Sequence, residues 1–599
     1  MSVPNRPDYI WYQRRFNVSL APNMVAKDII TAAGRRLVDD KVVRGELFAL
    51  AEPGVWLDPS DLTTLFQDTA GTTPVTTPNQ TVALALDKSR GLVLGPELWT
   101  AFGIITAPWT SVGGGVFNIN GSQTANRDLS QTPQYVANKF YVTTFTLSGV
   151  TGGAVTVFAG EGTVGPVYGN GTHTIRSLAS QAYLIFRAPA GVAATLSNIS
   201  VRELPGFHAT QSTAAARPIY GRHPFGGRRN LLTRTEEFND GAWVKSAVTV
   251  SADAATAPNG TLTADKLVET STTAQHFLQV SISATAGVVN GFSVYAKAAE
   301  RGFVILSMGA GPFAGGAVNE VWFNLATGSI GTNTGPADFA TITPVGDGWY
   351  RCFIGEQATA TGAALGFIKV AATNGTNSYA GDGTSGILIW GAQLELGSTA
   401  TAYQRVTTQF DVTEAGVPDV HYLFHGGASD PRWMITPTIT PGTDKVQVFA
   451  GVRKLSDAAI GVVAELSTTV DTNNGSLVLA APANNATPNY YFGSKGTLLV
   501  GVNPSGQTAP VTTVLTGLGN ISGDNTTLRV NGTQAAQSTA DQGTGNFLAY
   551  PLYIGMRGGT SLPFNGHNYG LIVRFGANLD PSVIAQTERW MAGKTGIAI

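Results

Sequence analysis

The sequence has very little cysteine and little charge. One thiol, Cys352, cannot form an intrachain disulfide framework, and this usage favours folding in a reducing compartment. Charged residues make up 13% of the chain, about half the share of roughly 25% in ordinary soluble proteins. The formal net charge of −2 provides no global field to recruit nucleic acid or an anionic membrane. No apolar run approaches about 18 residues and the N-terminus has no apolar signal region, so we expect neither a membrane span nor a secretory signal.

Glycine and residues that favour β-strands are abundant in the sequence. The 599 residues include 72 glycines, and Thr, Val, Ala, Asn and Ser are abundant. This composition is typical of many short strands joined by tight turns, and the length predicts three or four domains. We therefore predict a mostly β protein of several β-sandwich or jelly-roll domains. A short, partly helical N-terminal segment and a short C-terminal helix complete the predicted fold.

Residues 1–50 differ from the remainder of the chain. They carry clustered charge, and a four-residue spacing of apolar side chains predicts a helix that starts near Asn23, with Val25, Ile29, Ala33 and Leu37 on one face. The segment is either a solvated helix or an attachment segment that docks on a partner. In the second case its compact apolar anchor would be Trp11, Tyr12 and Phe16.

Two long blocks have the rhythm of complete jelly rolls. The first covers 94–205 and the second 226–405, each with alternating strands separated by Gly, Asn and Asp turns. In the strand that closes the second block, a period of two predicts one shared face for Leu388, Trp390, Ala392, Leu394 and Leu396.

The last region, 406–599, is also rich in strands but ends on DPSVIAQTERWMAGKTG. Asp580 suits an N-cap and Pro581 suits the first helical position, while Gly593 can end a helix in the left-handed conformation. The sequence predicts a short helix here that packs back on a sheet.

Several stretches resemble known families. GVWLDPSDLTTLFQDTAGTTPV, followed by LALDKSRG, resembles the opening of LamG-like (concanavalin A-like) domains of bacteriophage tail and fibre proteins. Pieces similar to GFHATQSTAAARPIY, VHYLFHGG and GLIVRFGANLDPSVIAQTERWMAGKTG follow in that family, and they are present here in order but separated. The block from RNLLTRTEEFNDGAW to GILIWGAQLELGSTATAY resembles the carbohydrate-binding-like jelly rolls of phage virion proteins.

The resemblance implies a domain order and a location. One discontinuous sandwich would combine 51–93, 206–225 and 406–599, with jelly rolls inserted at 94–205 and 226–405. A folded insert with close ends is tolerated at a surface loop. The resemblance further implies a virion component assembled in the host cytoplasm that contacts other virion proteins through residues 1–50. By analogy with phage fibres it would be a homotrimer.

The groups that an enzyme needs do not come together in the sequence. Glu395 stands alone and is interpreted as a solvent-facing strand residue, and Cys352 is interpreted as core. His421 and His425 lie four apart in a strand without a third zinc ligand, and the terminal AGKTG lacks the first glycine of a phosphate loop. We therefore predict no catalysis.

Sugar binding is a stronger hypothesis, because it needs only flat rings beside hydrogen-bonding groups. Trp109, Trp243 and Trp349 each lie beside turn residues, where a ring could be partly exposed; the alternative is that they cap the cores, as is expected of Trp322 and Trp390. Asp382 in GDGTSG is a candidate calcium ligand, or else part of a plain turn, and no other cofactor is expected. The basic cluster of Arg222, Arg228 and Arg229 is interpreted as a solvated hinge or an interdomain contact.

Two classes of function remain open. The first is a tail fibre or spike whose jelly rolls bind host-surface glycan. The second is a capsid decoration or head-fibre protein without a defined ligand. A polysaccharide-degrading enzyme is a distant third.

Overall fold

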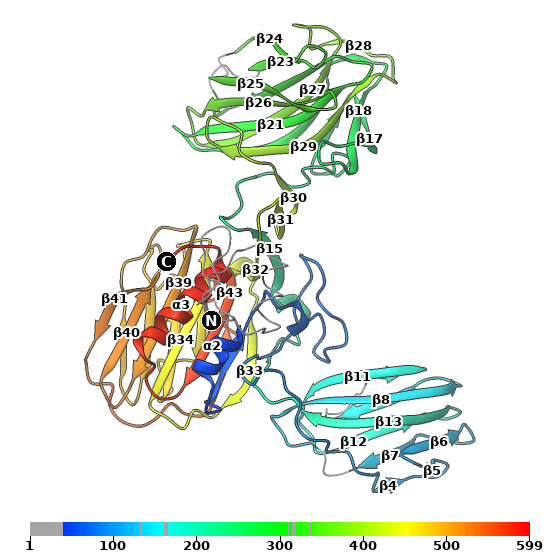
Figure 1. Ribbon diagram of the computed structural model, residues 1–599, viewed down its shortest axis with the longest axis vertical. Coiled ribbons are helices and arrows are strands. Elements are labelled where there is room, and N and C mark those ends of the chain that lie inside the picture. The colour runs from blue at the N-terminus through cyan, green and yellow to red at the C-terminus, as the bar shows by residue number, and fades with distance from the viewer. Residues whose placement is uncertain (1–39, 132–134, 161–165, 310, 314–318, 336–337) are drawn as a thin grey trace, which may run out of the picture. The chain divides into compact units, whose positions relative to one another are not determined.

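The computed structural model describes residues 40–131, 135–160, 166–309, 311–313, 319–335 and 338–599 (Figure 1). The described chain is mostly β-strand and ends in a helix, so the predicted fold class is confirmed. It divides into two compact units. The first combines the described residues up to Gly221 with Val420–Ile599, and the second is Arg222–Asp419. No helix of the described residues is long and apolar enough to cross a bilayer.

A two-sheet sandwich forms the larger part of the first unit. In its first sheet β1 (Gly54–Leu57) pairs with β43, and neighbouring strands follow the order β32 (Asp419–Gly426), β43 (Asn565–Phe575), β34 (Lys445–Lys454), β39 (Val511–Asn520), β40 (Asn525–Val530) and β41 (Thr533–Ser538). The order in the second sheet is β2 (Leu65–Phe66), β3 (Leu84–Ala85), β14 (Ala209–Thr210), β33 (Met434–Ile439), β42 (Tyr550–Ile554), β35 (Val462–Leu466), β36 (Ser476–Ala480), β37 (Tyr491–Lys495) and β38 (Leu499–Val502).

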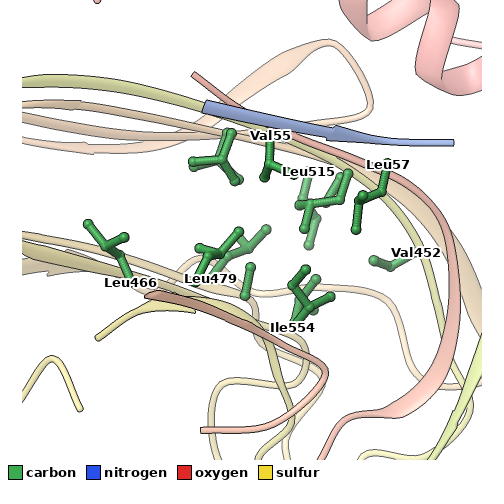
Figure 2. Close-up of a cluster of buried hydrophobic side chains, with 14 of the residues drawn as sticks. Val55, Leu57, Val452, Leu466, Leu479, Leu515 and Ile554 are labelled. Carbon is green, nitrogen blue, oxygen red and sulfur yellow. The ribbon is translucent and has the colours of Figure 1, made fainter. Parts of the chain in front are cut away.

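Segments far apart in the sequence pair directly in this sandwich. Val55 lies opposite Val573 and Leu57 opposite Leu571, while Ala209 of β14 lies opposite Ala85 of β3. Their side chains share one buried cluster, which Figure 2 shows between the two sheets with Val55, Leu57, Val452, Leu466, Leu479, Leu515 and Ile554 labelled. Strands from 54–85, 209–210 and 434–575 therefore fill a single core, although other parts of the chain separate them.

The two α-helices of the described residues pack on the first sheet. The C-terminal helix, α3 (Pro581–Thr595), lies across β34, β39 and β43, and α2 (Asp40–Leu47) lies against it (Figure 1). The Asp580 carboxylate accepts a hydrogen bond from Ser582 N at 2.8 Å, as an N-cap should. The predicted end at Gly593 is wrong, because the left-handed residue is Gly596, with φ 77°. The helix predicted near Asn23 and the anchor at Trp11, Tyr12 and Phe16 lie outside the described residues.

The first inserted block forms its own pair of sheets within the first unit. One sheet has the order β10 (Val167–Tyr168), β9 (Val155–Ala159), β12 (Leu184–Ala188), β7 (Arg127–Gln131) and β4 (Ile104–Ile105). The other has the order β11 (Gly171–Leu178), β8 (Phe140–Thr151), β13 (Ala193–Glu203), β6 (Val116–Asn120) and β5 (Thr110–Gly113). Alternate residues such as Phe117, Leu129 and Phe145 fill the core between them.

The second unit is a sandwich of two six-stranded sheets. The first sheet has the order β16 (Val244–Ser246), β20 (His276–Ala284), β27 (Gly362–Ala371), β22 (Phe303–Gly309), β23 (Glu320–Asn324) and β24 (Ser329–Asn333). The second has the order β17 (Val248–Thr256), β18 (Leu262–Glu269), β29 (Gly386–Leu396), β21 (Val289–Ala298), β26 (Trp349–Gln357) and β25 (Phe339–Gly346).

The two ends of the second unit are joined by one guanidinium. Arg222 donates to Asp411 at 2.7 Å and to Asp419 at 3.1 Å. The strand β30 (Gln404–Thr408) pairs with β31 (Asp411–Glu414), and Asp411 in turn lies opposite Arg222 of β15 (Ile219–Pro224). The chain therefore enters and leaves this unit at neighbouring points.

The alternation predicted for the closing strand β29 is wrong over its length. Ile387 and Ile389 face the core, and so do Ala392 and Leu394, which have the opposite parity. The reason is Gly391, whose φ of 62° coincides with a register shift against β21. Such a bulge inserts one residue and exchanges the two faces of a strand.

Candidate functional site

The three tryptophans named as sugar-binding candidates are buried. Trp109, Trp243 and Trp349 are 2%, 1% and 2% exposed, so they cannot stack on a sugar in this conformation. The indole N–H of Trp109 donates to Arg127 O at 3.1 Å and that of Trp243 to Arg234 O at 2.9 Å. A ring that closes the end of a core can thus lie beside a turn and still be buried. Trp322 and Trp390 are buried as well, as expected.

Asp382 organises a turn. Its carboxylate accepts hydrogen bonds from Thr384 N at 2.8 Å and from Ser385 N and Oγ at 2.7 and 2.6 Å. The Ser385 hydroxyl and the backbone donors hold the pKa of this carboxyl well below its usual range. Nowhere in the described ranges do three His, Cys, Asp or Glu side chains gather as metal ligands. The calcium prediction therefore has no support, because the lone carboxylate is already used by its own loop.

The other sequence candidates have structural partners. Glu395 was expected to face solvent and is only 2% exposed, because it accepts hydrogen bonds from Gln393 Nε2 at 2.7 Å and from Thr401 N at 2.9 Å. Cys352 is buried, and burial raises the pKa of its thiol. The two histidines do not converge, since His421 Nδ1 lies 2.7 Å from Tyr220 OH and His425 Nδ1 lies 2.7 Å from Arg432 O. Burial lowers the pKa of His425 to about 4.

The basic cluster is held inside the second unit. Arg222 pairs with Asp411 and Asp419, and Arg229 pairs with Glu414 at 2.9 Å. Arg228 donates to three backbone carbonyls, those of Asn230, Leu231 and Leu232. These contacts hold all three guanidinium groups in place, so the interpretation of the cluster as a solvated hinge is wrong.

A site that the sequence did not reveal lies on the outer face of the sheet β16–β20–β27–β22–β23–β24. Alternate side chains of β20, β27, β22 and β23 fill the core, among them Leu278, Ile368, Leu306 and Val321, so the residues between them point outward. Strand register aligns these outward residues in two rows. One row is Gln279, Phe367, Ser307 and Glu320; the next is Phe277, Lys369, Ile305 and Trp322.

A buried ion pair forms the floor of this face. The Lys369 ammonium donates to Glu320 and, at 2.9 Å, to Gln275 Oε1, while Asn377 Nδ2 donates to the other Glu320 oxygen at 2.7 Å. The side chains of Lys369 and Glu320 are 6% and 2% exposed. A buried charge pair costs little free energy only when its remaining donors and acceptors also form hydrogen bonds. Gln275 and Asn377 provide those bonds here.

Two phenylalanine rings lie over this ion pair. The rings of Phe277 and Phe367 meet edge to face with centroids 5.4 Å apart, and Lys369 Nζ is 5.6 and 5.0 Å from the two centroids. Both rings are partly exposed, as are Gln275 and Gln279, which precede and follow Phe277 on the same face. The ammonium beneath them fixes both rings through cation–π attraction, so their outer surfaces are held in place.

The chemistry of this face is recognition. Apolar ring surface lies beside side-chain amides that both donate and accept hydrogen bonds. In the described part of the chain the Ser307 hydroxyl, between Phe367 and Glu320, is buried without a hydrogen-bond partner. The signal for the face was present in HFLQVS and LGFIKV, where aromatic and polar residues alternate with aliphatic ones. Only the strand register, however, shows that the two segments are adjacent.

The fold therefore defines a protein built of β-sandwich and jelly-roll modules. No family model matches the chain, and no curated protein matches it. Among solved structures, the CBM40 of the Ruminococcus gnavus IT-sialidase bound to α2,6-sialyllactose is 16% identical, with 24% of this chain and 84% of that chain covered and a TM-score of 0.21.

Two further neighbours are similar at comparably low identity. The tandem CBM22 domains of Xyn10C from Paenibacillus barcinonensis are 12% identical, covering 51% of this chain and 99% of that one, with a TM-score of 0.19. A leech intramolecular trans-sialidase is 13% identical over 24% of each chain, with a TM-score of 0.20. Carbohydrate-binding jelly-roll domains are thus among the structural neighbours of this chain at low identity.

Proposed function

We propose that the second unit binds glycan through the outer face that carries Phe277 and Phe367. The observation that supports this most is the pair of fixed, partly exposed rings, with Gln279 on the strand of Phe277 and Gln275 directly before that strand. A pyranose has an apolar C–H face and a rim of hydroxyl groups, which match a ring surface bordered by amides. The face binds and does not catalyse in this proposal, so a bound polysaccharide stays intact.

The proposed binding is weak at one site and gains strength from copy number. A shallow face with two rings buries little ligand surface, so a dissociation constant in the high micromolar to millimolar range is expected, roughly −4 to −6 kcal/mol. Several copies in one assembly raise the effective affinity by about 10² to 10⁴.

We further propose that the chain is a phage virion component, most simply a tail fibre or spike that touches host-surface polysaccharide. This rests on the resemblance of the separated LamG-like pieces and on the inserted jelly rolls. Residues 1–50 would contact other virion proteins, and a trimer would supply the copies. The alternative, a capsid decoration or head fibre without a ligand, predicts that the phenylalanine face is dispensable for adsorption.

The test is to replace each ring separately, as Phe277→Ala and Phe367→Ala, in the full chain. Phe339, which is 41% exposed on β25 of the opposite sheet, provides the matched control Phe339→Ala. Retardation of the protein in native gels that contain host-surface polysaccharide measures binding, and adsorption of particles to cells measures its consequence. Reducing ends released from the polysaccharide report any cleavage.

The expected result is loss of retardation and of adsorption for the two face variants, with unchanged thermal unfolding and an unchanged control. Retardation of both face variants equal to that of the parent would overturn the proposed site. Full adsorption by both variants would favour the decoration role.

A further inference from the structure

A second face, on the first inserted jelly roll, has a different chemistry. Phe117 and Ile119 of β6 point into the core, so Asn118 and Asn120 point outward from the sheet β11–β8–β13–β6–β5. Strand register places Asn118 opposite Thr195 of β13 on one side and opposite Thr110 of β5 on the other. Amide and hydroxyl groups from three adjacent strands therefore meet at one place.

The sheet is hollowed at this place. A cavity of about 300 Å³ is lined by Pro108, Thr110, Asn118, Asn120, Ala193 and Thr195, among others. This volume reaches the lower end of the range for ligand pockets, roughly 300 to 1,000 Å³. The methyl group of Ala193, which lies opposite Asn120, leaves the space that a larger side chain would fill.

Charge is absent from the stretches that build the cavity. No Asp, Glu, Lys, Arg or His occurs at 98–126, 140–160 or 188–201, which supply its lining residues. A phosphate or carboxylate ligand would lose its hydration here without gaining a counter-charge. An uncharged ligand is therefore favoured.

Hydroxyl groups continue the polar surface along the same sheet. Thr146 of β8 and Thr172 of β11 lie opposite each other, with their hydroxyl oxygens 3.0 Å apart, and Asn198 Nδ2 donates to Thr146 Oγ1 at 3.3 Å. At the cavity itself Asn118 Oδ1 is buried with no hydrogen-bond partner among the described residues. An unmade bond to a buried acceptor is unfavourable, so a rotation of the Asn118 amide that lets a ligand hydroxyl donate to this oxygen would be stabilising.

We propose that this cavity binds one residue of a neutral saccharide and is a second glycan site, separate from the phenylalanine face of the second unit. Threonine hydroxyls and asparagine amides both donate and accept, as the hydroxyl groups of a sugar do. The inference rests on the proposed function in supposing that the chain recognises glycan. It adds a ligand class, because a saccharide with uronic or sialic acid is excluded from this cavity.

The experiment separates the two sites in the full chain. The parent, the variant Phe277→Ala/Phe367→Ala, and the same variant with Asn118→Ala or Ala193→Phe are applied to a printed array of neutral and acidic oligosaccharides. Asn118→Ala removes the central amide of the cavity, and Ala193→Phe fills the cavity. Ser130→Ala, on β7 of the opposite sheet and outside the residues that line the cavity, is the matched control, and thermal unfolding verifies each variant.

The expected result is residual binding of the phenylalanine double variant to neutral oligosaccharides only, reduced at least tenfold by Asn118→Ala or Ala193→Phe and unchanged by Ser130→Ala. Complete loss of binding in the double variant would overturn this inference and leave the proposed function standing. Binding of the double variant that equals that of the parent and is abolished by Asn118→Ala would support this inference while contradicting the proposed phenylalanine site. The inference would be overturned if both cavity variants kept the residual binding, or if that binding preferred acidic oligosaccharides. It would also be overturned if neither the parent nor any variant bound the array.

Discussion

A single buried carboxyl group gives the second unit a specific response to pH. Glu356 of β26 is 3% exposed and accepts a hydrogen bond from the Asn319 amide. Burial raises the pKa of this carboxyl from 4.5 to about 7, and the nearby charge of Asp338 raises it as well. Because the folded pKa lies above the unfolded one, the bound proton stabilises the folded state. This contribution is complete below about pH 4.5 and is lost as the pH rises to about 7.

Replacing this group by an uncharged isostere should remove the effect. Glu356→Gln keeps an oxygen that accepts from Asn319 and removes the charge, so we expect the variant to be more stable than the parent at pH 8 by about 1 to 3 kcal/mol, and equal to it at pH 4. Calorimetric unfolding of the full chain at the two pH values measures this. Asp347→Asn makes the same chemical change at an exposed position of this unit. A variant less stable than the parent at both pH values would show that the carboxylate itself is needed.

Aromatic residue type alone does not predict the exposure of a ring. The turn residues beside Trp109 and Trp243 suggested exposure, but the two indoles donate to carbonyl oxygens elsewhere in the chain, those of Arg127 and Arg234. Phe277 and Phe367 carry no such donor, so nothing local ties them to the backbone. Their exposure follows from the outward parity of two strands, which only the pairing of β20 with β27 makes visible.

At the scale of elements, α3 is fastened to α2 and to β1 through one residue. The Trp590 ring meets that of Trp56 edge to face at 5.2 Å, and its indole N–H donates to Asp40 Oδ1 at 2.9 Å. Lys594, one turn further, pairs with the buried Asp58 at 2.9 Å. Although burial raises the pKa of Asp58, the charges of Lys594 and Lys88 hold it well below its usual range. Helices from both ends of the described chain are thus held on one sheet.

Two substitutions of Trp590 separate packing from hydrogen bonding. Trp590→Ala should lower the free energy of unfolding by about 3 to 5 kcal/mol, because it leaves a cavity against Trp56. Trp590→Phe keeps most of the contact and removes the indole donor to Asp40 Oδ1, although Lys88 still donates to Asp40 Oδ2, so a loss of about 1 to 2 kcal/mol is expected. Urea unfolding of the full chain measures both. Arg589→Ala, at an exposed position of the same helix, is the control and should leave the free energy of unfolding unchanged. Equal losses of stability for Trp590→Phe and Trp590→Ala would show that packing and hydrogen bonding do not contribute separately.

The sequence neighbourhood of a residue predicted where α3 begins, but it did not predict where α3 ends or which side chains of β29 face the core. The N-cap at Asp580 could be recognised from its neighbours, because capping involves only adjacent residues. The end of α3 offered two glycines, and tertiary packing carries the helix past Gly593 to Gly596. In β29 the bulge at Gly391 reversed the faces that a period of two predicts. A glycine inside an alternating strand is the one sequence signal that could have indicated it.

At the scale of the whole molecule, the sandwich of the first unit depends on segments from both sides of a long insertion. Tyr220 and His421, which flank the second unit in sequence, have stacked rings with centroids 6.0 Å apart, and Tyr220 OH lies 2.7 Å from His421 Nδ1. The resemblance of the separated pieces suggested this arrangement. Composition and periodicity could not have done so, because neither reports which distant strands pair.

Removing the second unit should therefore leave the first intact. Joining Gly221 to Val420 through a short Gly-Ser linker deletes 222–419. We expect the remaining chain to fold, and calorimetry should give a free energy of unfolding for the first unit that is unchanged within about 1 kcal/mol. Loop closure costs little when the two ends already lie together. A chain that begins at Val420, by contrast, lacks β1, β3 and β14 and should not fold, as circular dichroism would show. Native-like stability of that truncated chain would contradict a shared core.

The guanidinium of Arg222, held between Asp411 and Asp419, has a consequence for inheritance. Because the two ends of the second unit, Arg222 and Asp419, lie side by side in space, recombination at its two boundary codons can exchange it whole without altering the strand order of its host. Under the proposed function, a lineage could replace its sugar preference in one genetic event. Selection on binding and selection on folding would then act on separate cassettes of the same gene.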